Sequence, residues 1–166
     1  LISTDELHQQ LSSVVPRILD IRWTLAAPDG SAAYRAGHIH GAVYVDLDAE
    51  LSDHTVPGGG RHPLPSAAAL QDSARRWGLN PGDPVVVYDD WNAQAAARAW
   101  WLLRAAGLHD VRILDGGWPA WQAAGLPTES GDVIPQPGSV VITALDAMPV
   151  ADADEVAVQA GSAGHA

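Results

Sequence analysis

The sequence predicts an α/β protein whose central parallel sheet of about five strands carries helices on both faces. Short β-branched segments alternate with helical segments between residues 17 and 125, which is typical of parallel strands joined by crossover helices. Of the 166 residues, 47% are apolar, enough to build the core of one domain. The sequence contains no cysteine, which excludes disulfides, thiolate metal sites and cysteine nucleophiles from this chain.

The N-terminal part of the chain is expected to begin with a helix over about 4–14. Ser3 lies three residues before Glu6, which is the spacing of a capping box, and Pro16 marks the end of this helix. The next expected elements are a compact strand over 17–23, a loop over 24–33 and a second strand over 42–47.

The second part of the pattern starts with a long loop over 52–65, which contains three consecutive glycines and three prolines. Ser66 is placed to cap a helix that extends to about Trp77, where the sequence GLNPGD ends it. The remaining expected elements are a β-branched central strand over 84–89, a helix over 94–106, a strand over 111–115 and a short helix within 116–125.

The composition changes after Leu126, where the chain becomes rich in proline, glycine and serine and resembles a linker. Asp152 then precedes Glu155 at capping-box spacing, so another helix is expected to start there. Composition alone leaves two interpretations open, a frayed tail or the beginning of a second domain. The expected division is a domain over 1–130, a linker over 131–150 and the start of a second, truncated domain over 151–166.

The charge balance narrows the choice of partners. The formal net charge is −11, and all nine basic residues are arginine. This balance disfavours nucleic acid and anionic membranes, so any anionic substrate must be held by a local arginine. No apolar run approaches the roughly 20 residues of a membrane span, and no signal sequence begins the chain, so a cytoplasmic location is expected.

The turn between the strand over 84–89 and the following helix has the position at which α/β proteins often carry a nucleophile, but it contains none. A helix N-terminus offers free N–H groups and the positive end of a dipole, which attract an anion. Here the chain supplies its own anion, because Asp89 and Asp90 can accept those hydrogen bonds. An acidic helix cap is a sufficient explanation from the residues alone. The turn comprises Asp89, Asp90, Trp91, Asn92, Ala93 and Gln94.

Two other groups of residues are candidate sites. His38 and His40 have the H-x-H spacing of metal ligands, but turn histidines that form local hydrogen bonds are more common, so no metal is expected. Arg61 and His62 lie in the glycine-rich loop, which lacks the spacing of a nucleotide-binding loop. The residues leave two interpretations of this pair open, a functional loop and a solvated surface loop. No serine-hydrolase or zinc-protease motif occurs.

Several segments together resemble the N-terminal domain of the two-domain sulfurtransferases, the family of rhodanese (thiosulfate sulfurtransferase) and 3-mercaptopyruvate sulfurtransferase. The similarity covers about residues 1–130 and implies the rhodanese-like α/β fold. It also implies that a second, C-terminal rhodanese domain carries the sulfur-accepting cysteine, with no metal or organic cofactor. The segments that carry the resemblance are LIST, ILDIRW, YRAGHIHGAVYVDL, GGRHPLPSAAAL, WGLNPGDPVVVYD, ARAWWLLRAAG and ILDGGWPAWQAAGLP.

The resemblance places Asp89 at the position of the catalytic cysteine. A carboxylate cannot form a persulfide and repels a thiosulfate dianion, so the chain has no catalytic residue of its own and is expected to be inactive alone. The parent protein is expected to transfer sulfane sulfur from a small anionic donor, thiosulfate or 3-mercaptopyruvate, to a thiophilic acceptor. The alternative is a stand-alone inactive module with a binding or regulatory role.

Three further expectations follow from the resemblance. The tail resembles the interdomain linker and first helix of the missing domain, so the chain is expected to be a fragment. Its partner is then the C-terminal domain, and an uncovered apolar patch around 91–101 is expected to favour self-association. Arg61 and His62 are expected to lie at the interdomain cleft, where Arg61 holds the donor and His62 helps to fix the loop.

Overall fold

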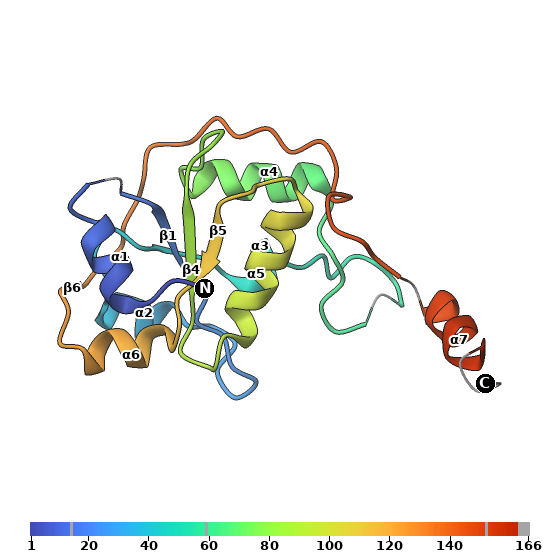
Figure 1. The fold of residues 1–166 in the computed structure, drawn as a ribbon, viewed down its shortest axis with the longest axis horizontal. Helices are drawn as coiled ribbons and strands as arrows, with labels where there is room; N and C mark the ends of the chain where they lie inside the picture. The colour runs from blue at the N-terminus through green and yellow to red at the C-terminus, as the bar shows by residue number, and fades with distance from the viewer. Residues whose placement is uncertain (14, 59, 152, 163–166) are drawn as a thin grey trace.

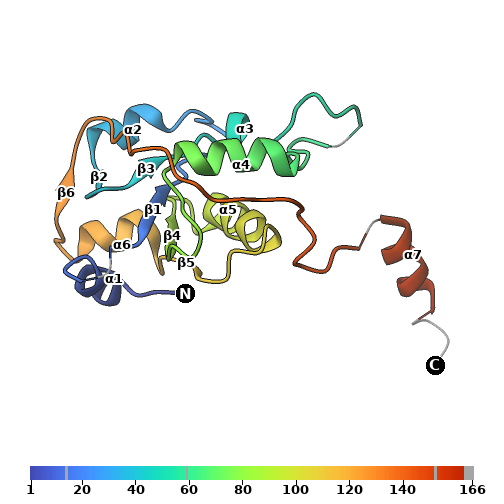
Figure 2. The same ribbon diagram turned by 90° about the horizontal axis from the view of Figure 1, so that it is seen from above.

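The computed structural model contains a parallel four-stranded sheet covered by helices on both faces, as the sequence predicted (Figure 1, Figure 2). It describes residues 1–13, 15–58, 60–151 and 153–162. The sheet has four strands, where about five were expected. In chain order the elements are α1 Thr4–Gln10, β1 Arg17–Asp20, α2 Ser31–Ala36, β2 His38–Ile39, β3 Val43–Tyr44, α3 Leu47–Glu50, α4 Ala67–Arg76, β4 Val85–Tyr88, α5 Gln94–Ala105, β5 Val111–Ile113, α6 Gly117–Ala123, β6 Thr128–Glu129 and α7 Ala153–Ser162.

The strand order is β3-β1-β4-β5, and every pairing in this sheet is parallel. Leu19 of β1 lies between Val43 of β3 and Val87 of β4, which fixes the register across the middle of the sheet. All four residues of β4 are buried, as expected for a central strand whose two faces are both covered. The strand therefore ends, at Tyr88, in the middle of the carboxyl edge of the sheet.

Two cores lie on opposite faces of the sheet, because successive side chains of a strand point to opposite sides. Val85 and Val87 belong to the core shared with α4 and α5, whereas Val86 and Tyr88 belong to the core shared with α1 and α6. The capping box expected for α1 is present, since the side chains and backbones of Ser3 and Glu6 bond reciprocally. The helices thus form a three-layer arrangement around the strands.

A helix begins inside the segment 24–33, which was expected to be entirely loop. Helix α2 is anchored by Arg22, whose guanidinium donates hydrogen bonds to the carbonyl oxygens of Ala33 at 2.9 Å and Gly37 at 2.6 Å. Gly30 packs so closely that a Cβ there would lie 2.1 Å from the Arg22 carbonyl oxygen. Contacts with Arg22, in the loop that follows β1, therefore stabilise this short helix, and no local pattern reveals them.

The segment 131–150, expected to be a linker, packs partly against the domain that precedes it. Val140 and Ile142 are both 4% exposed and join the core under α4. The Val140 carbonyl oxygen accepts a hydrogen bond from Arg75 at 2.9 Å, and the Val140 N–H donates to Leu79 at 3.0 Å. Helix α7 lies apart from the sheet in both views, and its expected cap, Asp152, is outside the described residues (Figure 1, Figure 2). The proposed domain boundaries remain predictions.

None of the helices in the described part of the chain has the length and apolar character needed to cross a membrane. Helix α5, which covers the centre of the sheet, has 12 residues. A spanning helix needs about 20.

Candidate functional site

The Asp89 carboxylate occupies a cradle of backbone N–H groups at the carboxyl end of β4. One of its oxygens accepts hydrogen bonds from the N–H groups of Trp91 and Ala93, each at 2.9 Å. The other accepts from Ala95 at 2.8 Å and Ala96 at 2.9 Å. Two of these donors lie in the turn, where they were expected, and two lie in the first turn of α5. The side chain is 1% exposed, so the anion is enclosed.

The cradle forms because the turn adopts an uncommon backbone conformation. Asn92 and Ala93 have φ angles of 54° and 62°, in the left-handed region that non-glycine residues seldom adopt. This conformation curls the chain so that successive N–H groups converge on one point, as in anion-binding nests. Asp90 and Gln94 are exposed and have no part in the cradle. The anion that the turn holds is therefore Asp89 alone.

The backbone of Asp89 is held from the other side by the turn into α6. The Asp89 carbonyl oxygen accepts a hydrogen bond from the Trp118 N–H at 2.9 Å. Gly117, with φ of +55°, lies so close that a Cβ would be 2.3 Å from the same oxygen. Only glycine allows this approach, so the GG pair in the sequence serves to position the cradle.

A pocket of about 360 Å³ lies beside the cradle, at the same edge of the sheet. The rings of Trp23 and Trp91 lie across it with centroids 5.9 Å apart, and Trp91 belongs to the cradle turn itself. The carboxyl edge of parallel strands is where ligands bind in open α/β sheets. The pocket is lined by Trp23, Leu47, His62, Trp91, Gln94, Ala95 and Arg98.

The two loop residues expected to form a site both lie at Trp23. The His62 ring packs edge-on against Trp23 with centroids 5.2 Å apart, and His62 lines the pocket. The exposed guanidinium of Arg61 lies 5.7 Å from the centroid of the Trp23 ring, within reach of a cation–π interaction. Arg61 and His62 are thus brought to the same edge of the sheet as Asp89.

The loop over 52–65 is fixed mainly by Arg98, a residue that sequence analysis missed. Its guanidinium donates to the carbonyl oxygens of Leu51 at 2.7 Å, His62 at 2.9 Å and Pro63 at 3.1 Å, so it joins both ends of the loop. Burial lowers the pKa of Arg98, and the nearby Asp48 opposes this shift. The bonded carbonyls are at least 35 positions away in the chain, so no local pattern could have revealed this role.

Asp48 of α3 is the second residue that sequence analysis missed. One of its carboxylate oxygens, Oδ1, lies 3.1 Å from Nδ1 of His62 and 3.6 Å from Nε2 of His54. The other oxygen, Oδ2, accepts a hydrogen bond from Nε1 of Trp23 at 3.1 Å. The net effect of the surroundings is to lower the pKa of His62: burial lowers it most, Asp48 opposes this, and Arg98 and Arg61 lower it further.

His38 forms a local hydrogen bond, as the more common interpretation of the spacing predicted, but His38 and His40 also both contact Glu129, which is distant in the chain. His38 is buried, with Nδ1 2.9 Å from the Tyr34 carbonyl oxygen and Nε2 3.2 Å from one carboxylate oxygen of Glu129. His40 lies 2.7 Å from the other Glu129 oxygen. The Gly41 N–H also donates to Glu129, at 2.7 Å. Both rings therefore secure the antiparallel pairing of β2 with β6.

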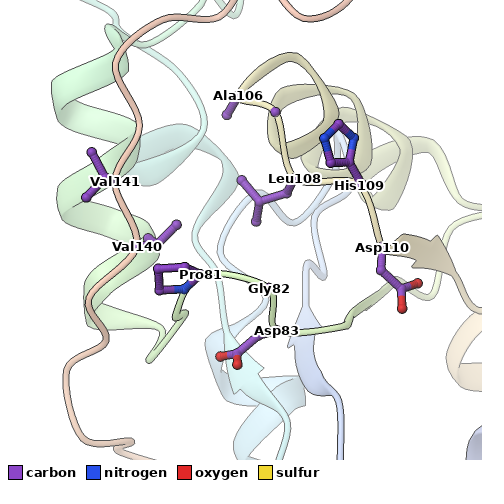
Figure 3. A pocket seen from close by; sticks show the side chains of 10 residues that line it. Pro81, Gly82, Asp83, Ala106, Leu108, His109, Asp110, Val140 and Val141 are labelled. Carbon is purple, nitrogen blue, oxygen red and sulfur yellow. The ribbon is translucent and has the colours of Figure 1, made fainter.

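A second pocket, of about 370 Å³, lies at the opposite, amino edge of the sheet (Figure 3). Leu108, Val140 and Pro81 form its apolar part, and His109 and Asp110 lie along its rim. It is formed by the segments that precede β4 and β5, away from Asp89. We therefore assign the candidate site to the carboxyl edge, where the cradle and the first pocket adjoin.

The tryptophans in the region where an apolar patch was expected are only half-buried. Trp91, Trp100 and Trp101 pack against the core on the α5 side and keep part of their surface exposed. Trp100 also donates a hydrogen bond to the Val111 carbonyl oxygen at 3.0 Å. Self-association through this region remains a prediction.

Comparisons with known proteins show which family the chain resembles. A family model described as rhodanese-like domain matches residues 3–124. The protein named "Putative thiosulfate sulfurtransferase SseB" from Mycobacterium tuberculosis is 53% identical over 165 residues, which cover 99% of this chain and 58% of the relative. The "Probable 3-mercaptopyruvate sulfurtransferase" of Pseudomonas aeruginosa is 43% identical over 141 residues, covering 83% and 50% of the two chains.

Among solved structures, the crystal structure of SseA from Escherichia coli, a 3-mercaptopyruvate sulfotransferase with the rhodanese fold, superimposes with a TM-score of 0.83. It is 32% identical to this chain, and the match covers 98% of this chain and 62% of that one. The chain spans about half the length of the curated relatives it matches.

Proposed function

The chain belongs to the rhodanese-like domain family, and on that premise we propose that it is the non-catalytic N-terminal half of a sulfurtransferase. In this proposal a second rhodanese domain carries the cysteine that accepts sulfane sulfur from thiosulfate or 3-mercaptopyruvate. That sulfur then passes to a thiophilic acceptor. The observation that carries the proposal is the Asp89 carboxylate, enclosed by four N–H groups where an active domain would hold a thiolate.

The chemistry of sulfur transfer supports the proposal that this half is non-catalytic. A covalent persulfide requires a nucleophilic thiolate, and the sequence contains no cysteine. The carboxylate of Asp89 satisfies the hydrogen-bond donors that would stabilise that thiolate, and its charge repels an anionic donor. The cradle is therefore a permanently filled anion site in this domain.

In this proposal the half has a structural role: the carboxyl edge of its sheet, which holds the cradle, packs against the second domain. The names of the relatives include both thiosulfate and 3-mercaptopyruvate sulfurtransferase, so both donors belong to the proposal. The partner at this edge is a C-terminal rhodanese domain of the same protein, whose active site the pocket beside the cradle would border. We also propose that the protein is cytoplasmic.

The intact mass of the protein purified from its source organism tests the arrangement. A mass consistent with about 110–130 further residues, together with a persulfide on a cysteine of that added part after thiosulfate treatment, supports the proposal. A mass equal to that of this chain alone would instead favour a stand-alone binding or regulatory module.

We expect the chain alone to show no thiosulfate:cyanide sulfurtransferase activity, because it has no thiol to carry the sulfur. The measurement is thiocyanate formation in metal-free buffer, with the complete protein as the positive control. Turnover by the isolated chain above the no-protein rate would contradict the assignment of this half as non-catalytic.

We expect Arg61→Ala in the complete protein to raise KM for the sulfur donor about tenfold, equivalent to about 1.4 kcal/mol, with a smaller change in kcat. The guanidinium lies over Trp23 beside the pocket and can hold an anionic donor in a strongly negative protein. Arg112→Ala is the matched control, because the Arg112 side chain is 40% exposed and its salt bridge among the described residues is with Asp110. Equal KM values for the two variants would assign Arg61 no part in donor binding.

A further inference from the structure

Three metal-ligating side chains converge beside the pocket at the carboxyl edge of the sheet. Asp48 comes from α3, and His54 and His62 come from the loop that follows it. One ligand atom from each residue lies within 4.8 Å of the other two. The segments that supply them are held together by Arg98, which bonds both ends of the loop.

The separations between these atoms suit a shared cation. Oδ1 of Asp48 is 3.1 Å from Nδ1 of His62 and 3.6 Å from Nε2 of His54. Ligand atoms bound tetrahedrally to Zn²⁺ at about 2.1 Å lie about 3.4 Å apart. The distance between the two histidine nitrogens is at most 4.8 Å. The two distances from Asp48 are within a few tenths of an ångström of this spacing, and the two histidine nitrogens must approach each other by up to about 1.4 Å to reach it.

Two of the three ligand atoms are buried without a hydrogen bond. Oδ1 of Asp48 and Nδ1 of His62 face each other at 3.1 Å, yet they do not form a hydrogen bond. Neither atom has another hydrogen-bond partner among the described residues. Buried polar atoms are almost always satisfied, so these two atoms, whose mutual contact is an ion pair only if His62 is protonated, are available to bind one cation together.

We propose that Asp48, His54 and His62 form a binding site for a divalent transition-metal ion, of which Zn²⁺ is the best match. One carboxylate and two imidazoles are a ligand set that Zn²⁺ and its neighbours in the first transition row accept, whereas Ca²⁺ and Mg²⁺ prefer oxygen alone. This differs from the expectation that the chain binds no metal. No local spacing predicted this site, because the ligands are separated by 6 and 8 residues across a helix and a loop.

The surroundings of the site support it in one respect and oppose it in another. Nε1 of Trp23 donates to the free oxygen of Asp48 at 3.1 Å, which orients the carboxylate as outer-shell donors do at metal sites. The positive charges of Arg61 and Arg98 lie near His62 and weaken the attraction of a cation. A bound ion would join α3 to the glycine-rich loop and so restrict the loop that carries Arg61.

The test is a titration of the metal-free 166-residue chain with Co²⁺, followed by its visible absorption, and then displacement of Co²⁺ by Zn²⁺. We expect one equivalent to produce ligand-field bands of a four-coordinate ion and one equivalent of Zn²⁺ to abolish them. His54→Ala and His62→Ala are each expected to weaken binding at least about tenfold, and Trp23→Phe about tenfold through loss of the bond to Asp48.

His8→Ala is the matched control, since His8 is exposed on α1 and its ring lies edge-on to the Trp121 ring, away from Asp48. Its binding curve should equal that of the unmodified chain. His54 is 53% exposed, so its replacement should not impair folding, which circular dichroism would verify. Absence of a saturable band, or a band of equal affinity in the His54→Ala variant, would overturn the proposal.

Discussion

Replacing Asp89 by alanine is expected to lower the free energy of unfolding by about 4 kcal/mol. The reason is the number of donors that one side chain satisfies. Four backbone N–H groups lose their acceptor, and each buried donor left without one costs about 1–3 kcal/mol. Water that enters the vacated space satisfies some of them, so the total is below the full sum. Urea unfolding followed by tryptophan fluorescence measures the loss.

Asp89→Asn and Asp90→Ala supply the controls for this prediction. Asparagine keeps one acceptor oxygen but directs an NH₂ group at the remaining N–H groups, so we expect about half of the alanine effect. Asp90 is exposed, and its replacement should change stability by no more than about 0.5 kcal/mol. Equal stability of the Asp89→Ala and Asp90→Ala variants would show that the cradle contributes nothing to the fold.

The same position offers a direct test of the cradle as an anion site. In Asp89→Cys the four N–H groups should favour a thiolate and lower the thiol pKa below about 7. In Asp90→Cys, where no such donors converge, the thiol should titrate near its ordinary value of about 8.5. The pH dependence of alkylation rates gives both values. Identical profiles would contradict the interpretation that this turn stabilises an anion.

Arg22→Met is expected to have a comparable effect, a loss of about 3–5 kcal/mol. The Arg22 side chain is 4% exposed and forms a bidentate pair with Asp20, which is fully buried. The guanidinium also lies 4.6 Å from the centroid of the Trp118 ring. Methionine removes the donors to the carbonyl oxygens that hold α2. Among the described residues, the buried Asp20 carboxylate then keeps only the hydrogen bond from the Tyr88 hydroxyl, at 2.5 Å.

The pH dependence of the Arg22→Met effect identifies its cause. Burial raises the pKa of Asp20, and Arg22 opposes this shift. Without Arg22 the folded-state pKa rises further above the unfolded value of about 3.9. A carboxyl group whose pKa is higher in the folded than in the unfolded protein does not change the free energy of unfolding at pH values where it is protonated in both. It lowers that free energy as the pH rises from the unfolded-state pKa through the folded-state pKa. The deficit should therefore be smaller at pH 4 than at pH 7, when both are measured by urea unfolding.

Two further variants separate the buried charge from lost packing. Asp20→Asn combined with Arg22→Met should recover part of the stability at pH 7, because no ionised group remains at the pair. Arg112→Met breaks an exposed arginine–aspartate pair and should cost no more than about 1 kcal/mol. A deficit that is independent of pH and unchanged in the double variant would attribute the effect to packing alone.

The sequence by itself determined the class of fold and the chemistry that this chain lacks. The β-branched run of β4, its flanking helices and the capping box at Ser3 are local features, and the structure contains each of them. The count of cysteines and the position of Asp89 before a helix also needed no three-dimensional information. Local patterns suffice here because helix and strand periodicity and caps act between residues a few positions apart.

Only the tertiary structure decided which distant side chains meet. The pairing of β2 with β6 depends on His38 and Glu129, which are 91 positions apart. The bonds of Arg98 to the glycine-rich loop and the approach of His54 and His62 to Asp48 arise because that loop and α5 meet at the carboxyl edge of the sheet. The order of the strands determines which of these distant side chains come into contact. That order results from burying both faces of the sheet, which depends on the whole chain and is not encoded in any short segment.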